Sequence, residues 1–205
     1  MGNLSLAEEL GLKSFEAPRY QLSLHYPDSL ISLPPPIPQS LLFLRHKDAL
    51  HPTFNIVSQP RPTKESKKSL KKQVRQLLNS YREVGLTDTK LIDYHEISVS
   101  GHEALSASLR FSQGEVAFRS NVTVIPLQSN ELIFTYIDRY DDYEKNGALW
   151  KLLLSSISLP QELSQPEKIK AAPSNTLLWN SLAAILGLFA VFLMWRWTHS
   201  RKSSP

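Results

Sequence analysis

The chain has 205 residues, of which 23 are basic and 19 acidic, and it contains no cysteine. The lack of cysteine excludes disulfides, thiolate metal sites and cysteine nucleophiles, so packing alone must hold the fold. Three of the basic residues follow position 195, which leaves 20 basic against 19 acidic residues before it. A general nucleic-acid binder has a strong excess of basic residues, which this chain lacks, so no nucleic-acid partner is expected.

The N-terminal third of the chain predicts a leader and three strands. Residues 1–17 are predicted to be a loosely attached leader. Apolar and polar side chains alternate over residues 19–26, which indicates a half-buried strand. Residues 41–45 and 53–57 predict the next two strands, whereas the prolines of residues 33–38 favour a loop or polyproline II.

Two helices are predicted further along the chain. Apolar residues recur at helical spacing from Leu70 to Tyr81, which indicates an amphipathic helix. Thr63 can cap its start, and Gly85 can close its end. A second helix is predicted over about residues 141–156, with acidic residues in its first turn, where the helix dipole favours negative charge.

Four strand candidates follow one another between these helices. Turn signals at Ser100-Gly101 and Gln113-Gly114 separate them, which predicts an antiparallel meander. The four strands are expected at residues 91–99, 103–111, 115–125 and 132–138. The whole pattern predicts an α+β domain over residues 18–158, in which a largely antiparallel sheet of about six or seven strands packs with two helices.

The C-terminal part of the chain predicts a membrane anchor. Residues 159–176 contain three prolines and are expected to be a linker. Leu177–Trp195 carries no charge over nineteen residues and spans roughly 28 Å as a helix, close to the hydrocarbon thickness of a bilayer. One transmembrane helix is therefore predicted over residues 177–197, followed by a basic tail over 198–205. Its expected anchors at the membrane interface are Trp179, Trp195, Arg196 and Trp197.

The two ends of the chain give the expected topology. Residues 1–16 have neither a basic n-region nor an apolar h-region, so no signal peptide is predicted. We therefore expect a single-pass, tail-anchored protein with a cytoplasmic domain, bound to the lipid bilayer through residues 177–197. The basic residues after the span favour the opposite topology, and a periplasmic or otherwise extracytoplasmic domain stays open as the alternative.

Several short motifs resemble the PsbP/DcrB-like domains. The strand that ends in Tyr-Pro-Asp (residues 20–28) resembles their opening element, residues 53–57 their third strand, and Gly101–Ala104 their Gly-x-x-Ala hairpin. Phe134-Thr135-Tyr136 and the helix end at 153–157 resemble their last two elements. The resemblance covers about residues 18–158, although Ser29-Leu30 replaces the aromatic residue that often follows Pro-Asp. It implies a non-catalytic binding or assembly module.

The histidines do not predict a metal site. His95 and His102 are each followed by glutamate, but a turn at Ser100-Gly101 separates them by roughly 13–17 Å along the hairpin, too far to share an ion. His46 and His51 lie in a loop without further ligands at suitable spacing. We expect no metal and no cofactor.

Catalytic motifs are also missing from the sequence. It contains no nucleophile elbow, no phosphate-binding loop and no H-E-x-x-H pattern. One acidic cluster could supply paired carboxylates, but it is interpreted first as the charged start of a helix; its members are Asp138, Asp141, Asp142 and Glu144. We expect no enzyme, and a hydrolase that uses this cluster is the least favoured alternative.

One charged feature stands out on the first predicted helix. On a helical wheel five basic residues form a single stripe beside the apolar one: Lys64, Lys68, Lys71, Arg75 and Arg82. Two interpretations stay open. The stripe is a solvated helix face, or it contacts an anionic partner, either an acidic protein surface or the membrane leaflet.

The sequence therefore predicts a membrane-anchored, non-catalytic protein-binding domain that localises or stabilises a partner at the membrane. The partner is expected to be a protein that the sequence does not identify. The first alternative is a chaperone or assembly factor for a membrane complex. The second is a lipid-binding or small-ligand-binding domain, whose sign would be an apolar cavity lined by Tyr94, Phe118 and Phe134.

Overall fold

The computed structural model describes residues 11–60 and 70–160, with side chains throughout except at 70–76. Three parts of the chain lie outside these ranges: residues 1–10 of the predicted leader, the predicted helix cap at Thr63, and all residues after Pro160. Within the described residues no helix is both long and apolar enough to cross a membrane. The predicted transmembrane helix at 177–197 and basic tail at 198–205 are among the residues that lie outside it.

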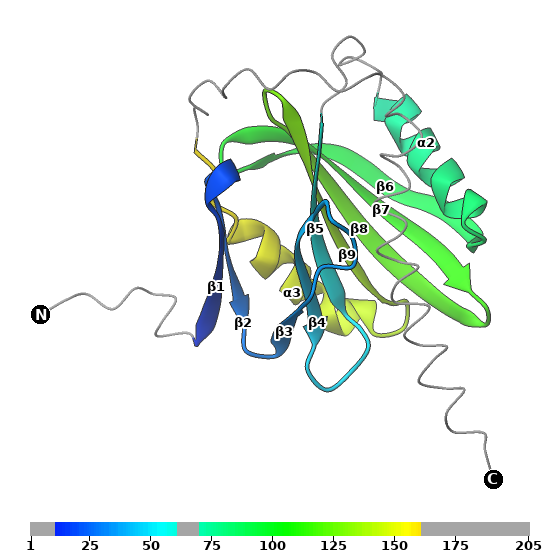
Figure 1. Ribbon diagram of the computed structural model, residues 1–205. Coiled ribbons are helices and arrows are strands. Elements are labelled where there is room, and N and C mark those ends of the chain that lie inside the picture. The colour runs from blue at the N-terminus through cyan, green and yellow to red at the C-terminus, as the bar shows by residue number, and fades with distance from the viewer. Residues whose placement is uncertain (1–10, 61–69, 161–205) are drawn as a thin grey trace, which may run out of the picture.

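A seven-stranded antiparallel sheet forms the centre of the domain, in the order β3-β4-β5-β9-β8-β7-β6 (Figure 1). Two-residue turns and short loops join neighbours, so the predicted meander from β6 to β9 is confirmed. The strands are β3 (Leu30–Leu33), β4 (Ser40–His46), β5 (Thr53–Pro60), β6 (Thr87–Val99), β7 (His102–Gln113), β8 (Val116–Pro126) and β9 (Asn130–Arg139).

The N-terminal strands differ from the prediction. Residues 12–17, expected in a loose leader, form β1 (Leu12–Ala17), which pairs with β2 (Leu22–Pro27) in a separate two-stranded sheet. A short 3-10 helix, η1 (Pro18–Tyr20), occupies the first residues of the strand predicted from position 19. The strand β3 was not predicted. It is only four residues long and directly precedes the prolines.

Two helices lie on opposite faces of the sheet, α2 (Leu70–Glu83) on one and α3 (Tyr143–Ser155) on the other (Figure 1). This arrangement confirms the predicted α+β class. Gly85 follows α2 with φ +83°, and the amide of Leu86 bonds back to the carbonyl of Tyr81, so the predicted glycine does close the helix.

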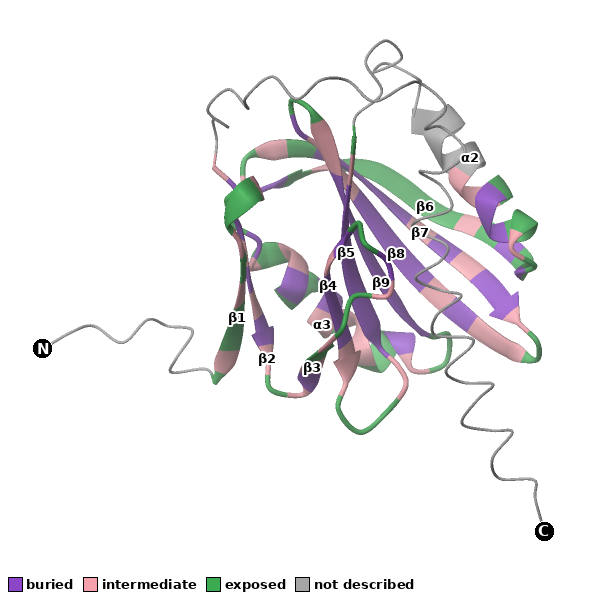
Figure 2. Cartoon of the chain, in the orientation of Figure 1, coloured by how far each residue is buried: buried purple, intermediate pink, exposed green. Residues whose placement is uncertain are grey.

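The face under α2, called here the α2 face, is packed with aromatic rings. Tyr81 of α2 meets the edge of the Phe111 ring at 5.4 Å, and Phe111 stacks on Phe118 at 5.5 Å. The buried residues of this cluster alternate along the strands with those of the opposite face. Figure 2 shows that the strands in the middle of the sheet are buried along much of their length. This period of two is what a sheet buried on both sides requires.

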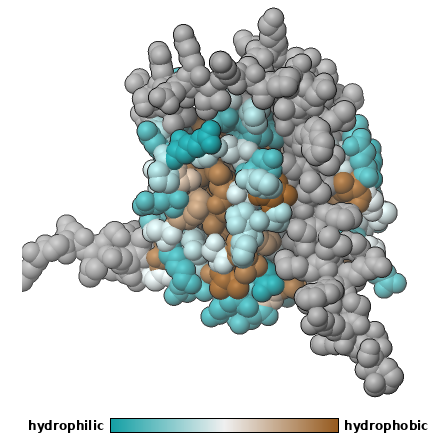
Figure 3. All heavy atoms as spheres, in the orientation of Figure 1, coloured by the Kyte–Doolittle hydropathy of each residue, from teal (hydrophilic) through white to brown (hydrophobic). Residues whose placement is uncertain are grey.

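The face under α3, called here the α3 face, holds the larger core cluster. Trp150 of α3 lies 6.2 Å from Phe54 and 5.9 Å from Tyr136, ring centre to ring centre. The small β1–β2 sheet closes this core, because Leu22 and Leu24 of β2 are fully buried in it. In the view of Figure 3, apolar residues are visible at the surface near the middle of the molecule, and hydrophilic residues surround them.

The last described residues, Ser156–Pro160, are bound to both sheets and are called here the exit clasp. Ser158 exchanges two backbone hydrogen bonds with Ser23 of β2, at 2.9 and 3.0 Å. The Ser100 hydroxyl donates to the Leu159 carbonyl at 3.1 Å and accepts from its amide at 2.9 Å. The linker was predicted to begin at 159, but Leu159 is only 5% exposed, so the packed domain continues to this point.

Candidate functional site

Polar side chains gather where α3 begins. Because α3 starts four residues after β9 ends, its first turn lies over β8 and β9. There it meets inward-facing polar residues of those strands instead of apolar ones. The residues of this polar network are Arg119, Asn121, Tyr136, Asp138, Tyr143, Glu144 and Asn146.

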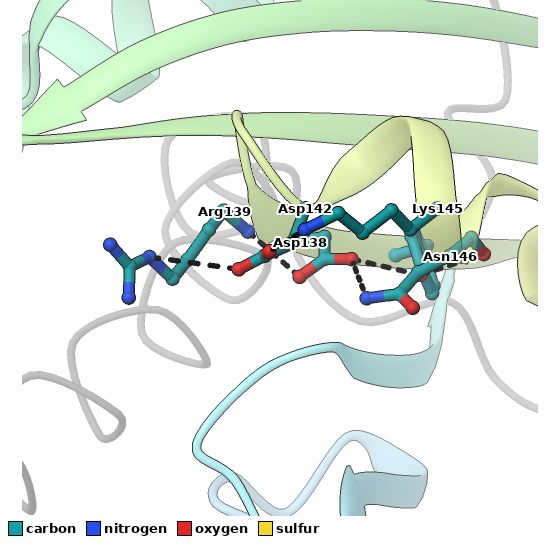
Figure 4. Close-up of polar contacts among 6 residues, drawn as sticks. Asp138, Arg139, Asp142, Lys145 and Asn146 are labelled. Atoms are coloured by element: carbon teal, nitrogen blue, oxygen red, sulfur yellow. Dashed lines mark hydrogen bonds and ion pairs between the residues drawn. The ribbon is translucent and has the colours of Figure 1, made fainter.

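Asp138 is the centre of this network and is 1% exposed. Its carboxylate accepts from the Asn146 side-chain amide at 2.8 Å and from the Arg139 backbone amide at 2.8 Å (Figure 4). It also accepts from the Tyr136 hydroxyl at 3.4 Å. Burial raises the pKa of Asp138, and these hydrogen bonds act in the opposite direction. The carboxylate is therefore held by protein donors and not aimed at open solvent.

Two tyrosines complete the interior of the network. Burial, together with the nearby Asp138 carboxylate, raises the pKa of Tyr136, so its hydroxyl keeps its proton and acts as a donor. The same hydroxyl lies 3.3 Å from the Asn146 carbonyl. The Asn121 side-chain amide donates to the Tyr143 hydroxyl. Each of these polar groups has a partner within the domain, as buried polar groups require.

The predicted acidic cluster does not converge on one point. Asp138 is buried, Asp142 pairs with Lys145 at 3.3 Å and Arg139 at 4.0 Å, and Asp141 is exposed. Glu144 points to Arg119 at 3.1 Å. In the described part of the chain no three His, Cys, Asp or Glu residues lie close enough together to hold a metal ion. The carboxylates thus hold the start of α3 in place.

The histidines lie apart, as the hairpin register requires. His102 is opposite Val99 and His95 is opposite Ser106, so they sit at different heights of the hairpin. His95 pairs with Asp93 at 3.1 Å, whereas His102 Nε2 donates to the Pro160 carbonyl at 2.8 Å in the exit clasp. His51 packs on Phe118 at 4.9 Å, and burial lowers the pKa of its imidazole to about 4.

The predicted ligand cavity is not formed by the three residues named for it. Tyr94 is 40% exposed on β6. Phe118 belongs to the core of the α2 face, and Phe134 to the core of the α3 face. The sheet itself separates these two rings, so they cannot line one cavity.

The predicted contact residues are only partly described. Arg82 lies exposed in the last turn of α2. Lys71 and Arg75 belong to the same helix, but their side chains are not described. Two further stripe residues and all the predicted membrane anchors lie outside the described residues: Lys64, Lys68, Trp179, Trp195, Arg196 and Trp197.

A row of cations that sequence inspection missed crosses the α3 face. Lys90 is opposite Arg110, Arg110 is opposite Arg119, and Arg119 is opposite Asp138, on four neighbouring strands. Lys90, Arg110 and Arg119 are called here the cation row. The available signal was the β7–β8 turn, because counting outward from Gln113 and Val116 pairs Arg110 with Arg119.

No family model matches the sequence, and no curated protein is similar to it in sequence. Solved structures are similar in fold. Cyanobacterial PsbP (CyanoP) from Synechocystis sp. PCC 6803 is 14% identical with a TM-score of 0.61, over 78% of this chain and 97% of that chain. LpqN, involved in cell envelope biogenesis of Mycobacterium tuberculosis, is 13% identical with a TM-score of 0.51, over 78% and 100% of the two chains.

The Saccharomyces cerevisiae Ran-binding protein Mog1p is 9% identical with a TM-score of 0.51, over 73% of this chain and 96% of that chain. Identities this low show the fold alone. The described domain therefore has a PsbP-like fold, as its motifs implied.

Proposed function

We propose that the chain is a membrane-tethered, non-catalytic domain that localises or stabilises a protein partner at a membrane. The observation that carries the proposal is the uncharged run Leu177–Trp195. Ten of its residues are Leu, Ile, Val or Phe, each favouring insertion by about 0.3–0.6 kcal/mol, or about 3–6 kcal/mol together. Tryptophans at both ends suit the two membrane interfaces.

The way the chain leaves the domain supports this proposal. The exit clasp holds Leu159 and Pro160 against the start of β7, so the residues that follow begin at a fixed point. Residues 161–176 would then be the linker, and a flexible chain of that length reaches roughly 20–25 Å. Such a tether keeps the domain close to the bilayer and leaves it free to turn towards a partner.

The predicted basic stripe follows β5 in the sequence. Pro60, the last residue of β5, pairs with Asn130 beside the β8–β9 turn, and this end of the sheet also carries His102 and Pro160. The stripe residues come after this end of β5 in the chain: Lys64, Lys68, Lys71, Arg75 and Arg82. We propose that the stripe contacts an anionic surface at or near the membrane, where each basic residue contributes about 1 kcal/mol.

Membrane tethering can be tested on the full chain by extraction at alkaline pH. The wild type is expected to stay in the membrane pellet. The double variant Leu186→Arg/Leu188→Arg is expected in the supernatant, because two central arginines oppose insertion by about 5–7 kcal/mol and cancel the apolar run. Ala183→Ser is the matched control and should stay in the pellet. Complete extraction of the wild type would overturn the tether.

The topology and the basic stripe need separate measurements. We propose a cytoplasmic domain, for which residues 1–170 are protected from protease in vesicles with the native orientation and are digested only after lysis; digestion before lysis would place the domain outside. Charge reversal at Lys64, Lys68, Lys71 and Arg75 is expected to weaken cross-linking to the partner and binding to anionic liposomes. Unchanged binding in both assays would remove the stripe from the proposal.

A further inference from the structure

The cation row on the α3 face is an arrangement that folding alone does not favour. Directly opposed residues on neighbouring strands have Cβ atoms about 4.5–5.5 Å apart, and like charges at such positions destabilise a sheet. Here two such pairs occur side by side, Lys90 with Arg110 and Arg110 with Arg119. The row therefore needs a reason other than the stability of the sheet.

Arg119, at the inner end of the row, has its partners within the domain. Its Nε donates to the Ser108 hydroxyl at 3.0 Å, and its Nη1 donates to Glu144 at 3.1 Å. The guanidinium also lies 4.0 Å from the centre of the Tyr143 ring. One of the three positive charges is thus neutralised and fixed.

Arg110 and Lys90 differ from Arg119 in this respect. The Nε of Arg110 is buried and makes no hydrogen bond, although its guanidinium is positioned 4.7 Å over the ring of Tyr140. Among the described residues neither Arg110 nor Lys90 forms an ion pair. A guanidinium that is held in place but lacks an acceptor is ready to bind an anion from outside.

Four acidic residues on β6 and at the start of α3 are bound to other partners. Asp93 is occupied by His95 at 3.1 Å, and Asp88 accepts from the Ser112 hydroxyl at 3.3 Å. Glu144 is occupied by Arg119, and Asp142 pairs with Arg139 and Lys145. These carboxylates therefore leave the free side of Arg110 to an incoming group.

The exposed surface around Arg110 has the composition of a protein contact. Tyr140 is 40% exposed and covers Arg110. Tyrosine and arginine are the residues most enriched at the energetic centres of protein interfaces. A guanidinium fork fits a planar carboxylate with two parallel hydrogen bonds.

We infer that the cation row, with Tyr140 beside it, is the contact through which the domain binds an acidic segment of a protein partner. This inference rests on the proposed function in one respect, namely that the domain binds a protein. A carboxylate of the partner bonds to Arg110 and is flanked by Lys90. Arg110 is eight residues along β7 from His102, roughly 27 Å at about 3.3 Å per residue, so the row lies away from the exit clasp.

The test uses the full chain in nanodiscs of phosphatidylcholine, whose headgroups carry no net charge. The probe is a fluorescein-labelled hexaglutamate peptide, and binding is measured by fluorescence anisotropy and by the NMR signal of the arginine Nε–H groups. The wild type is expected to bind, with a shift of the Arg110 signal. Arg110→Gln is expected to weaken binding at least tenfold, and Arg110→Lys about threefold, because lysine keeps the charge but loses the fork.

Arg19→Gln is the matched control, because Arg19 is also a surface arginine over a tyrosine, 5.8 Å from the Tyr20 ring, but has no second cation opposite it. It should bind like the wild type. An equal loss in Arg19→Gln and Arg110→Gln, at unchanged unfolding midpoints, would overturn the inference. Tighter binding of inorganic phosphate than of the peptide, lost in Arg110→Gln, would also overturn it by assigning the row to phosphate.

Cross-linking from intact membranes separates this inference from the proposed function. If the wild type and Arg110→Gln cross-link the same protein equally, the row is not the contact and protein binding stands. If the wild type cross-links no protein although it binds hexaglutamate in an Arg110-dependent manner, the proposed function fails and the site stands as a binder of acidic peptide. Loss of the cross-linked protein in Arg110→Gln alone supports both.

Discussion

The two faces of the β7–β8 hairpin differ near its turn. On the α2 face Phe111 stacks on Phe118 under the Tyr81 ring. One residue away on each strand, the α3 face carries Arg110 and Arg119 over tyrosine rings. The hairpin therefore separates the buried aromatic packing from the proposed contact by side-chain direction, and single substitutions at adjacent positions should affect one and spare the other.

The largest expected difference is between two neighbours on β7. Phe111→Ala should lower the free energy of unfolding by about 3–5 kcal/mol, because it removes a buried ring from the α2 face. Arg110→Ala should change it by no more than about 1 kcal/mol, since a partly exposed cation without an ion pair contributes little. Urea unfolding of both variants checks the contrast, and equal losses would contradict it.

On the α2 side, His51 should make the folded domain less stable in acid. The pKa of His51 is lowered to about 4 by burial beside Phe118, below its unfolded value of 6.5. The unfolded chain then binds more protons between these values, so stability falls as the pH drops from about 6.5 to about 4, by up to about 3 kcal/mol. His51→Phe should remove this slope in pH-dependent unfolding, whereas the exposed His95→Phe should keep it.

The α3 side should respond to acid with the opposite sign. Burial raises the pKa of Asp138 above its unfolded value of 3.8, so the folded chain holds the proton more tightly. This contribution to stability is fully present below the unfolded pKa and is lost as the pH rises through the folded one. Asp138→Asn should flatten that slope, and exposed Asp141→Asn should not. A steeper slope in Asp138→Asn would reverse the assignment.

The smallest expected contrast concerns one tyrosine hydroxyl on each face. Tyr136→Phe removes a donor from the Asp138 carboxylate and should cost about 1.5–3 kcal/mol, the range for hydrogen bonds to charged groups. Tyr81→Phe removes a 3.4 Å hydrogen bond to the neutral Ser120 hydroxyl and should cost about 0.5–1.5 kcal/mol. Thermal unfolding of both variants at pH 7 measures the difference.

Most of the sheet could be predicted from alternation and turns, because its strands bury one or both faces. The strands that escaped prediction bury little. β1 contributes only Phe15 and Ala17 to the edge of a core, and between them stands charged Glu16. The four residues of β3 directly precede a run of prolines, so the sequence pattern does not distinguish this strand from the loop. The end of the domain was also not predicted correctly. Leu159 has the sequence surroundings of a linker, and only its hydrogen bonds to Ser100 show that it belongs to the exit clasp.

The polar sites were harder to predict, because they join residues far apart in the sequence. Asp138 was assigned to the charged start of a helix, although its period of two from Phe134 and Tyr136 indicates the buried face. Arg110 and Arg119 are neighbours only through the register of one turn. A helical wheel finds basic stripes, but pairs across strands appear only when the residues are counted outward from each turn.

The exit clasp also determines which bonds of the domain bear a force that is applied to its C-terminal end. A pull on the C-terminal residues acts first on the hydrogen bond between His102 of β7 and Pro160, then on the Ser100–Leu159 pair and the Ser23–Ser158 backbone pair. Because these bonds join the small β1–β2 sheet to the hairpin end of the large one, the load is divided between two sheets. Under the proposed tether, motion of a membrane relative to a bound partner would thus load the first residue of β7 and the seam between the sheets, at the end of β7 far from Arg110.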